Sequence, residues 1–566
     1  MATLYGVLKF TGILLEVVLI FNLLIIVHEL GHFLAAKWRG LYIEGFGIWF
    51  GKPIWKKKIG GVTYSLGCIP AGGFVKLPQL MDSAIEGDSE YAGKDLPKLK
   101  PLDKIIVAVA GPVFSFLLAC LFAVIVWQVG QPVGEADRAT TIGYVVPGYP
   151  ADGKLKAGDE ILSIDGHPIT RWGGQSQGSV LWRIAGSEED TVKMEILRDG
   201  KTQSVEIAPK VEATKWYQRR GLHQIGLHPM SRPMIARTIP GSPAEKAGFL
   251  PNDVLTLVGG EKIYEESSIG VWARANPGKP LVLTVERGGK RGDGTVPTTD
   301  ITFEPRGFLV DAVFPDSPAA RAGLQKDDRV LSADGVPTPF PEIFVEHVWA
   351  HNGKPVTLAT VRGGIVKTIT VTPEIPLEGS DKPSIGIALA RGEGFVFDSR
   401  GKMWPIHPTP GEQISQATGA MYEMFKKLSP TSKSGISFQH MGGPLMMMRI
   451  YYLLFESPDG WRLVLWFSVV INVNLALMNM LPIPPLDGSH ITLAFVELLR
   501  GRPPGKSTQR IVEYIQTVGT LLIVGFMLYV TFFDAQDLLG GGKKPAMRFK
   551  PHAAQSEVLH EHAARA

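Results

Sequence analysis

Long hydrophobic runs stand near the two ends of the chain, whereas the middle alternates apolar with polar residues. Four runs are almost free of charge, over residues 4–27, 105–129, 463–481 and 518–533. Because about 20 residues cross the hydrocarbon core of a bilayer, each run predicts a transmembrane helix. The last helix could begin nearer Ile511, which would place Glu513 at its mouth. A signal peptide is the alternative for the first run, but that run is too long and lacks a basic start and a small-residue cleavage site.

Basic residues flank the predicted helices unevenly, and this predicts their orientation. They gather in the loop after the first helix and in the loop between the third and fourth: Lys37, Arg39, Lys52, Lys56, Lys57, Lys58, Arg500, Arg502, Lys506 and Arg510. By the positive-inside rule both loops are cytoplasmic, so residues 131–400 and both termini lie outside. Basic residues in the C-terminal tail favour the opposite orientation, but two loops outweigh one tail.

A sequence pattern recurs three times in the outer segment, beginning at Pro147, Pro240 and Pro315. Each copy runs from Pro-Ala to an Ala-Gly pair and then to an aspartate before a short apolar run. This pattern is typical of a short helix that ends at glycine and leads into a strand, and the first and third copies continue into an Asp-Gly turn. It resembles the PDZ fold in its bacterial variant; a set of unrelated small β-domains is the alternative.

We therefore expect three PDZ-like units, each of mixed α and β structure, at residues 131–212, 225–306 and 307–376. PDZ domains commonly bind a peptide strand or its terminus along an open sheet edge, so the resemblance implies peptide termini as partners. The expected fold is a multi-domain membrane protein. It has an α-helical transmembrane core of about four helices, a cytoplasmic-side β-hairpin region and three extracytoplasmic PDZ-like α+β domains.

The composition agrees with a chain made of two unlike parts. Its mean hydropathy is +0.10, and 45% of its residues are apolar while 20% are charged. This content excludes a disordered chain, and the two cysteines, Cys68 and Cys120, exclude a disulfide scaffold. The net charge of +4 comes with no dense basic face, so we expect no binding of nucleic acid. Membrane lipid is the expected surrounding of the apolar runs.

Candidate chemistry begins at the end of the first apolar run, with His28, Glu29 and His32 in an HExxH pattern. Two histidines four residues apart share one helical face, so both imidazoles can reach one metal ion. Glu29 is then placed to take a proton from water at that ion. Ionisable residues at membrane depth are costly, which favours a functional site over a chance match.

A third ligand is needed for a zinc site, and Asp487 is the strongest candidate. It follows a proline-rich break after the third apolar run, and such breaks at membrane depth occur where the backbone is buried in protein or faces water. An ordinary Asp-Gly turn at the membrane surface is the alternative for Asp487.

The two motifs together resemble the site-2 protease family of intramembrane zinc metalloproteases, in its bacterial branch with PDZ domains. The family patterns match at His28, Glu29, His32, Asn479, Pro482, Pro484, Leu486, Asp487 and Gly488, and further stretches match at residues 45–47, 70–76 and 110–112. The chain departs at Ser115, where relatives often have asparagine, and at Ser489, where they have glycine. Three PDZ-like units also exceed the one or two of well-known relatives.

The resemblance implies a protease half at residues 1–130 and a second half at 405–540, followed by a polar tail at 541–566. His28, His32 and Asp487 would hold Zn²⁺, and Glu29 would be the general base. The enzyme would cleave transmembrane segments of single-pass proteins, such as anti-sigma factors or signal-peptide remnants. It would sit in the bacterial inner membrane as a multi-pass protein, with its site toward the cytoplasm and its PDZ region in the periplasm.

Substrate binding is predicted at two places. Asn479 resembles a family position that holds the substrate backbone, although capping of a carbonyl in the broken helix explains it equally well. Residues 62–66 and 73–77 read as a hairpin with Gly73, Phe74 and Val75 on an edge that could pair with an unwound substrate. Residues 413–427 predict an amphipathic helix at the outer surface, which either gates access or packs at the interface.

Two other functions compete with proteolysis. The first is a membrane-anchored PDZ scaffold or chaperone with an inactive metal site, and the intact HExxH pattern argues against it. The second is a transporter that uses intramembrane histidine and aspartate, which the cytoplasmic hairpin and the PDZ-like array do not suit.

Overall fold

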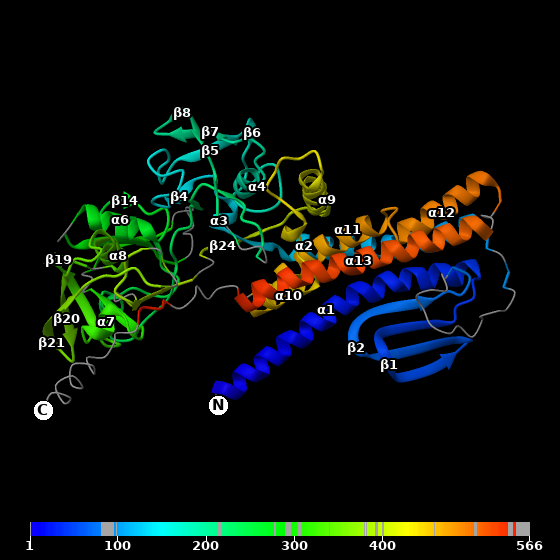
Figure 1. The fold of residues 1–566 in the computed structure, drawn as a ribbon, viewed down its shortest axis with the longest axis horizontal. Helices are drawn as coiled ribbons and strands as arrows, with labels where there is room; N and C mark the ends of the chain where they lie inside the picture. The colour runs from blue at the N-terminus through cyan, green and yellow to red at the C-terminus, as the bar shows by residue number, and fades with distance from the viewer. Residues whose placement is uncertain are drawn as a thin grey trace, which may run out of the picture.

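The apolar runs form long helices at one end of an elongated molecule, and the β-rich units lie at the other end (Figure 1). The computed structural model describes residues 2–550 except 81–95, 98, 213, 215–217, 277–278, 289–295, 304–306, 339, 378–379, 381, 391–393, 399–400, 458, 503–505 and 541–546. Of the predicted polar tail, only residues 547–550 therefore fall among the described residues.

Within the described residues, four helices are long and apolar enough to cross a membrane. They are α1 (Ala2–Arg39), α2 (Pro101–Val129), α11 (Gly460–Asn479) and α13 (Lys506–Gly540). This confirms the four predicted runs, and the candidate span on α13, Arg510–Leu538, begins next to Ile511. Leucines such as Leu19 and Leu522 point outward from α1 and α13, as side chains that contact lipid do.

Helix α2 is the centre of the helical region, because it packs against α1, α11 and α12 (Asp487–Arg500). Small residues make this close packing possible. A Cβ on Gly31 of α1 would lie 2.4 Å from the carbonyl oxygen of Ala110 on α2, so only glycine fits there. Ala119 and Ala123 are fully buried in the cluster that joins these helices.

The predicted amphipathic helix is α9 (Pro410–Leu428), which begins with a Thr409–Glu412 capping box. It packs against α2 and α11, and its Ala417 joins their apolar core. The buried Gln413 donates from Nε2 to the carbonyl oxygen of Ala123 at 2.9 Å. The helix is followed by η1 (Phe438–His440) and α10 (Pro444–Glu456).

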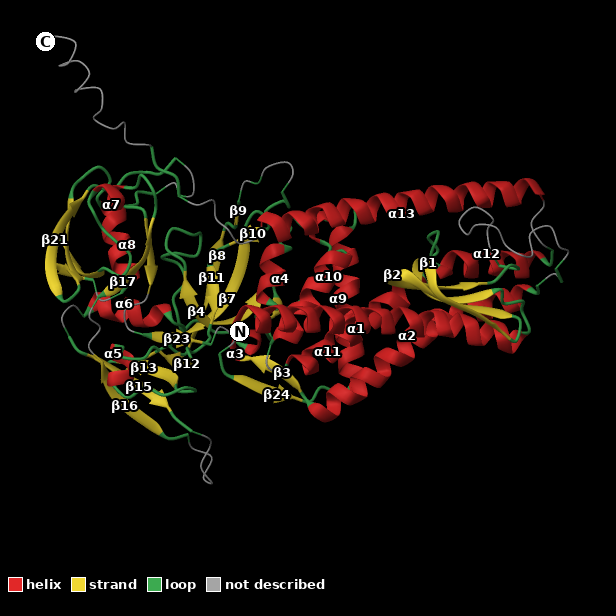
Figure 2. Ribbon diagram, turned by 90° about the horizontal axis from the view of Figure 1, so that it is seen from below, coloured by secondary structure: helices red, strands yellow, loops and turns green. Residues whose placement is uncertain are grey.

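Strands β1 (Gly45–Ile59) and β2 (Val62–Lys76) form an antiparallel sheet at the end of the helices that lies away from the PDZ-like units (Figures 1 and 2). The expectation that residues 62–66 pair with 73–77 is wrong. Residues 45–48 lie between the two segments and pair with both. The reason is that β2 is one long strand that bends around β1, so no turn separates its two ends.

The three PDZ-like units each have their own apolar core. The first contains β4 (Ile142–Val145), β5 (Glu160–Ile164), β6 (His167–Pro168), α4 (Val180–Ala185), β7 (Val192–Arg198) and β8 (Lys201–Ile207). The second contains β12 (Ile235–Thr238), α5 (Pro243–Lys246), β13 (Val254–Val258), β14 (Glu261–Lys262), α6 (Ser267–Ala275), β15 (Leu281–Glu286) and β16 (Thr298–Phe303). The third contains β17 (Phe308–Val313), α7 (Pro318–Arg321), β18 (Arg329–Ala333), β19 (Val336–Pro337), α8 (Pro341–Ala350), β20 (Val356–Arg362), β21 (Ile365–Val371) and β22 (Ile387–Ala390).

Each unit is completed by a strand that comes later in the sequence than the rest of the unit. The strand pair that closes one unit can enclose another whole unit in the sequence, so the pairs are nested. β11 (Leu227–Pro229) pairs with β4, β22 pairs with β17, and β23 (Phe395–Phe397) pairs with β12. Outside them, β24 (Met403–Ile406) pairs with β3 (Gln131–Gly134), which precedes α3 (Glu135–Arg138). Short strands β9 (Lys210–Val211) and β10 (His223–Gln224) pair in the linker after the first unit. The sequence-based boundaries at 212 and 376 leave out β11 and β22, because a strand added from a distant segment carries no local turn signal.

Candidate metal centre

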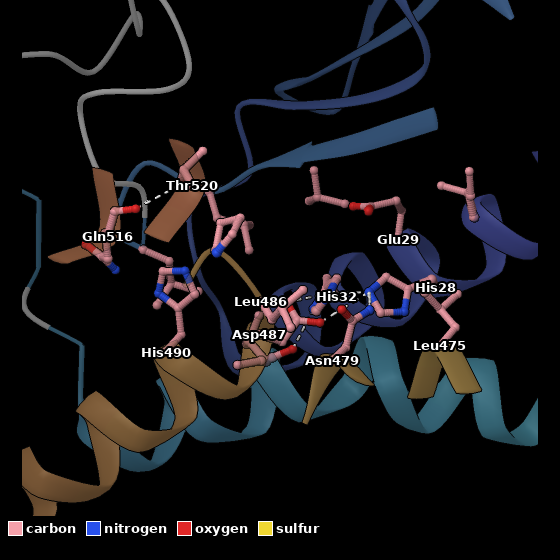
Figure 3. Close-up of a pocket in the computed structure, with 17 residues that line it drawn as sticks. His28, Glu29, His32, Leu475, Asn479, Leu486, Asp487, His490, Gln516 and Thr520 are labelled. Atoms are coloured by element: carbon pink, nitrogen blue, oxygen red, sulfur yellow. Dashed lines mark hydrogen bonds and ion pairs between the residues drawn. The ribbon is translucent and has the colours of Figure 1, made fainter. Parts of the chain in front are cut away.

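His28 and His32 of α1 meet Asp487 at the first residue of α12 (Figure 3). The Nε2 atom of His28 lies 3.2 Å from Oδ2 of Asp487, and Nε2 of His32 lies 3.5 Å from Oδ1. The two Nε2 atoms are 3.3 Å apart. One ligand atom from each residue can therefore reach a common point, although the chain separates the aspartate from the histidines by more than 450 residues.

The proline-rich break between α11 and α12 delivers Asp487 to this point. α11 ends at Asn479 and α12 begins at Asp487, with Pro482, Pro484 and Pro485 in between. The chain turns so tightly that a Cβ on Gly488 would lie 2.2 Å from the carbonyl oxygen of Leu481. Glycine after the aspartate is therefore required by the turn, and not only by the motif.

Groups on α2 orient the two imidazoles through contacts with their Nδ1 atoms. Nδ1 of His32 lies 2.8 Å from the carbonyl oxygen of Val107. A carbonyl only accepts, so this Nδ1 carries a proton, and in the neutral tautomer that binds a metal the lone pair on Nε2 faces Asp487. Nδ1 of His28 lies 3.0 Å from Oγ of the fully buried Ser115. A Cβ on Gly111 would lie 2.2 Å from Nε2 of His32, so α2 has room only for a glycine at this position.

When both imidazoles carry their proton on Nδ1, three atoms with lone pairs face one another here, namely the two Nε2 atoms and a carboxylate oxygen of Asp487. Oδ2 of Asp487 is buried and makes no hydrogen bond. Acceptors that face one another in a buried place are costly unless a cation lies between them. Two imidazoles and one carboxylate are the donor set of a catalytic zinc site, which keeps a fourth position for water. The residues present therefore fit a zinc ion.

A cavity of 480 Å³ opens in front of the cluster and is lined by Glu29, Val75, Asn479, His490, Gln516 and Thr520, among others (Figure 3). Glu29 lines this cavity together with the two histidines. Nδ2 of Asn479 lies 3.4 Å from Nε2 of His28, so this residue also stands next to the cluster of His28, His32 and Asp487.

The three predicted residues of β2 divide between two faces of the strand. Gly73 approaches Glu29, since a Cβ on Gly73 would lie 3.4 Å from Cγ of Glu29, and Val75 lines the cavity. Phe74 packs against Gly47 instead and stacks on Phe50 with 6.2 Å between ring centroids. Alternate residues of a strand face opposite sides, so Phe74 does not share the cavity with its neighbours.

Three further residues stand at the site although the sequence patterns do not predict them as site residues: His490, Gln516 and Ser115. His490 follows Asp487 by one helical turn, a spacing that could have indicated it. Gln516 is a polar residue in an apolar helix, and its buried Oε1 has no hydrogen-bond partner. Ser115 departs from the family pattern in the sequence, and the sequence alone gives it no role at the site.

Residues 16–524 match the model of peptidase family M50. The chain is 27% identical over 531 residues to a Neisseria meningitidis protein named "Putative zinc metalloprotease", with 92% of this chain and 98% of that protein covered. It is 24% identical over 533 residues to the regulator of sigma-E protease RseP of Salmonella typhimurium, with 91% and 96% covered. Among solved structures, the PDZ domain of an SdrC-like protein from Listeria monocytogenes matches at 24% identity and a TM-score of 0.14, and the match covers 15% of this chain and 87% of that domain.

Proposed function

The chain belongs to peptidase family M50 and is a zinc metalloprotease of the site-2 type, and on this premise we propose that it cuts transmembrane segments of single-pass proteins within the bilayer. The observation that carries the proposal is the position of the cluster. His28, Glu29 and His32 lie within a candidate membrane span, and Asp487 follows the break at the end of another. A soluble peptide would not need a hydrolytic centre at that depth.

In this proposal His28, His32 and Asp487 hold the zinc ion. When bound, zinc polarises the scissile carbonyl and acidifies the attacking water. Val107 and Ser115 keep the two imidazoles turned toward the ion. Glu29 takes the proton from the attacking water and passes it to the amine nitrogen of the leaving chain. The peptide bond gains one water molecule, so no other reactant is needed.

Substrate binding follows from the same cavity. The peptide bonds of a transmembrane helix are shielded, so the substrate must unwind before it is cut. Residues 73–76 of β2 form an edge next to Glu29, and an unwound segment could add to it as a strand. Asn479 stands at the metal cluster and offers an amide to the substrate backbone. Gly73 and Val75 would then contact the substrate, while Phe74 would stiffen the strand from its other face.

The substrates and the location are proposed from two observations. The relatives named as sigma-E regulators favour membrane-bound anti-sigma factors, and signal-peptide remnants fit the same site. The basic loops at the end of the helices that bears β1 and β2 favour a cytoplasmic side for the centre, in the inner membrane of a bacterium. The PDZ-like units would then stand outside and select which chains reach the cavity.

Glu29→Gln tests the proposal in the full chain, reconstituted with a model single-pass substrate. We expect zinc content to stay at the wild-type value and cleavage to fall by roughly 10²- to 10⁴-fold, because a general base contributes that much. Glu16→Gln is the matched control, since Glu16 lies on the same helix at an exposed position. Its cleavage rate should equal that of the wild type.

Two outcomes would overturn the proposal. One is a Glu29→Gln variant that cuts as fast as the wild type. The other is a zinc-loaded wild type that cuts nothing under conditions in which a related protease works, which would favour the scaffold with an inactive metal site.

A further inference from the structure

A second cluster of two histidines and one aspartate lies on the third PDZ-like unit, far along the chain from the candidate centre. Asp334 occupies the Asp-Gly turn between β18 and β19, His347 lies on α8, and His351 caps the end of that helix. Among the described residues, this cluster and the His28 cluster are the two that bring three ligand atoms from histidine, cysteine or carboxylate within 4.8 Å of one another.

The ligand atoms of this cluster converge as they do in the first one. Nε2 of His347 lies 2.8 Å from Oδ2 of Asp334, and Nε2 of His351 lies 3.9 Å from the same oxygen. The imidazole rings stack with 4.3 Å between centroids and 24° between planes. Two ligands on a tetrahedral zinc ion are about 3.3 Å apart, so small side-chain rotations bring all three atoms to one ion.

Backbone groups hold these side chains in place, as second-layer groups do at metal sites. The N–H of Thr357 donates to Oδ1 of Asp334 at 2.7 Å, which leaves Oδ2 turned toward the histidines. Nδ1 of His351 lies 2.7 Å from the carbonyl oxygen of His347. Because that carbonyl can only accept, Nδ1 carries the proton, and Nε2 of the neutral ring keeps its lone pair for a ligand.

The first PDZ-like unit shows that the fold itself does not require this arrangement. Its turn carries Asp165, and the N–H of Lys193 donates to Oδ1 of that aspartate at 2.9 Å, as Thr357 does in the third unit. The helix above it, α4, contributes Arg183 instead of a histidine pair, and a guanidinium cannot bind a cation. The turn with its anchored aspartate is therefore common to both units, whereas the pair of histidines on the helix belongs to the third alone of these two. The first unit has His167 directly after its turn, but that histidine contacts Arg183.

We propose that Asp334, His347 and His351 bind a divalent transition-metal ion of the zinc type on the outer surface of the third PDZ-like unit. The set of two imidazoles and one carboxylate suits zinc, with water completing the coordination. The ion would fasten α8 to the β18–β19 turn and, through Thr357, to β20. This site would bind the ion without hydrolysing a peptide bond, because it lacks a general base. In the first cluster Glu29 follows His28, whereas here Val348 follows His347 and is buried in the apolar core of the unit.

Zinc counting on the full chain in detergent tests the proposal. The protein is stripped with a chelator and dialysed against buffered zinc, and bound zinc is measured by elemental analysis. We expect His347→Gln to hold one zinc ion fewer per chain than the wild type. His228→Gln is the matched control, because His228 is an exposed histidine of the PDZ-like region outside this cluster, and it should bind as much zinc as the wild type.

A second variant and a second measurement keep the test independent of folding and of the catalytic centre. Asp334→Asn keeps the acceptor for Thr357 and removes the charge, and it should also lose one ion. Zinc should slow hydrogen exchange at residues 334–351 in the wild type and in Asp487→Asn, but not in His347→Gln. The proposal fails if His347→Gln and Asp334→Asn keep the wild-type zinc content. It also fails if His228→Gln loses as much zinc as they do.

Discussion

Ser115 contacts the His28 imidazole on the side away from the candidate metal position, so it can orient this ring. Its Oγ lies 3.0 Å from Nδ1 of His28, and its side chain is fully buried. Groups that hold the far nitrogen of a ligating histidine are worth roughly 10- to 100-fold in metal affinity. We therefore expect Ser115→Ala to weaken zinc binding by roughly 10- to 100-fold, measured by competition with a chelator of known affinity.

The control for Ser115 is another buried serine of a transmembrane helix. Ser468 of α11 donates to the carbonyl oxygen of Val464 at 2.7 Å and contacts the hydroxyl of Tyr451, away from the metal cluster. Ser468→Ala should keep the wild-type zinc affinity. Equal losses in the two variants would mean that helix packing, and not the orientation of His28, sets the affinity.

Residue chemistry explains which parts of the site the sequence could predict. His28 and His32 were predictable because four-residue spacing on a helix places them on one face wherever that helix lies. Asp487 could be found because a proline-rich break with an aspartate is unusual at membrane depth. Ser115 and Gln516 could not be assigned, since their approach to the site depends on how α2 and α13 cross their neighbours.

At the scale of elements, each of the three PDZ-like units contains an ion pair between a buried aspartate and a partly exposed arginine. The repeated aspartate after the Ala-Gly pair meets an arginine near the end of a later strand, in the pairs Asp159–Arg198, Asp253–Arg287 and Asp328–Arg362. Each arginine binds both carboxylate oxygens and also a backbone carbonyl of the loop before the aspartate. The aspartate was visible as part of the repeat, but its partner was not, because 34 to 39 residues separate them.

Removal of one of these carboxylates should open the unit that contains it. Asp328 is fully buried, and its Oδ2 also accepts from the N–H of Gln325 at 2.8 Å. We expect Asp328→Ala to raise the opening equilibrium of the third unit by roughly tenfold to a hundredfold, because buried partners lose their acceptor. Hydrogen exchange on the full chain measures this. Asp311→Ala is the control, since Asp311 forms an exposed pair with Lys326 and should change little.

Acid should remove the stabilisation that the Asp328 carboxylate gives to the third unit. The Arg362 guanidinium holds the pKa of Asp328 below its ordinary value of 3.8. A carboxylate whose pKa is lowered in the folded state stabilises that state fully at pH values above its ordinary pKa. It loses this stabilisation as the pH falls through its pKa in the folded state. The difference in opening between wild type and Asp328→Ala should therefore be constant near neutral pH and shrink below about pH 4. A constant difference down to pH 2 would contradict this assignment.

At the scale of the whole molecule, α13 links the candidate centre to the PDZ-like units. Gln516 and Thr520 of this helix line the cavity, and a Cβ on Gly519 would lie 2.8 Å from Cβ of Pro484 in the break. Asp534 lies 18 residues beyond Gln516, or about 27 Å along a helix, and there α13 meets the linker that follows the first unit. The nested strand order and this long link could not be predicted, because both arise from contacts between segments far apart in the chain. The separation is 74 residues between Val313 and Ile387 and 318 residues between Arg219 and Asp537.

Arg219 makes the contact between that linker and α13. Its guanidinium donates to Oδ1 of Asp534 at 2.7 Å and to Oδ2 of Asp537 at 2.6 Å. Asp534 is fully buried, and its other oxygen accepts from the N–H of Met446 at 3.1 Å. Removal of one partner of a buried ion pair leaves the other charge without compensation, which is strongly destabilising. The contact therefore anchors the linker after the first PDZ-like unit to the helix that lines the cavity.

Arg219→Ala should release this anchor without emptying the metal centre. We expect faster hydrogen exchange at the last turns of α13 and faster proteolysis of the linker at residues 208–222. Zinc content should stay unchanged, because the proposed metal ligands lie on α1 and α12. Arg220→Ala is the matched control, since Arg220 is exposed and its bonds to Gln439 and His440 come from its backbone. If both variants exchange alike, the ion pair does not hold the two parts together; if Arg219→Ala also loses zinc, α13 supports the centre itself and the anchor is not separable from it.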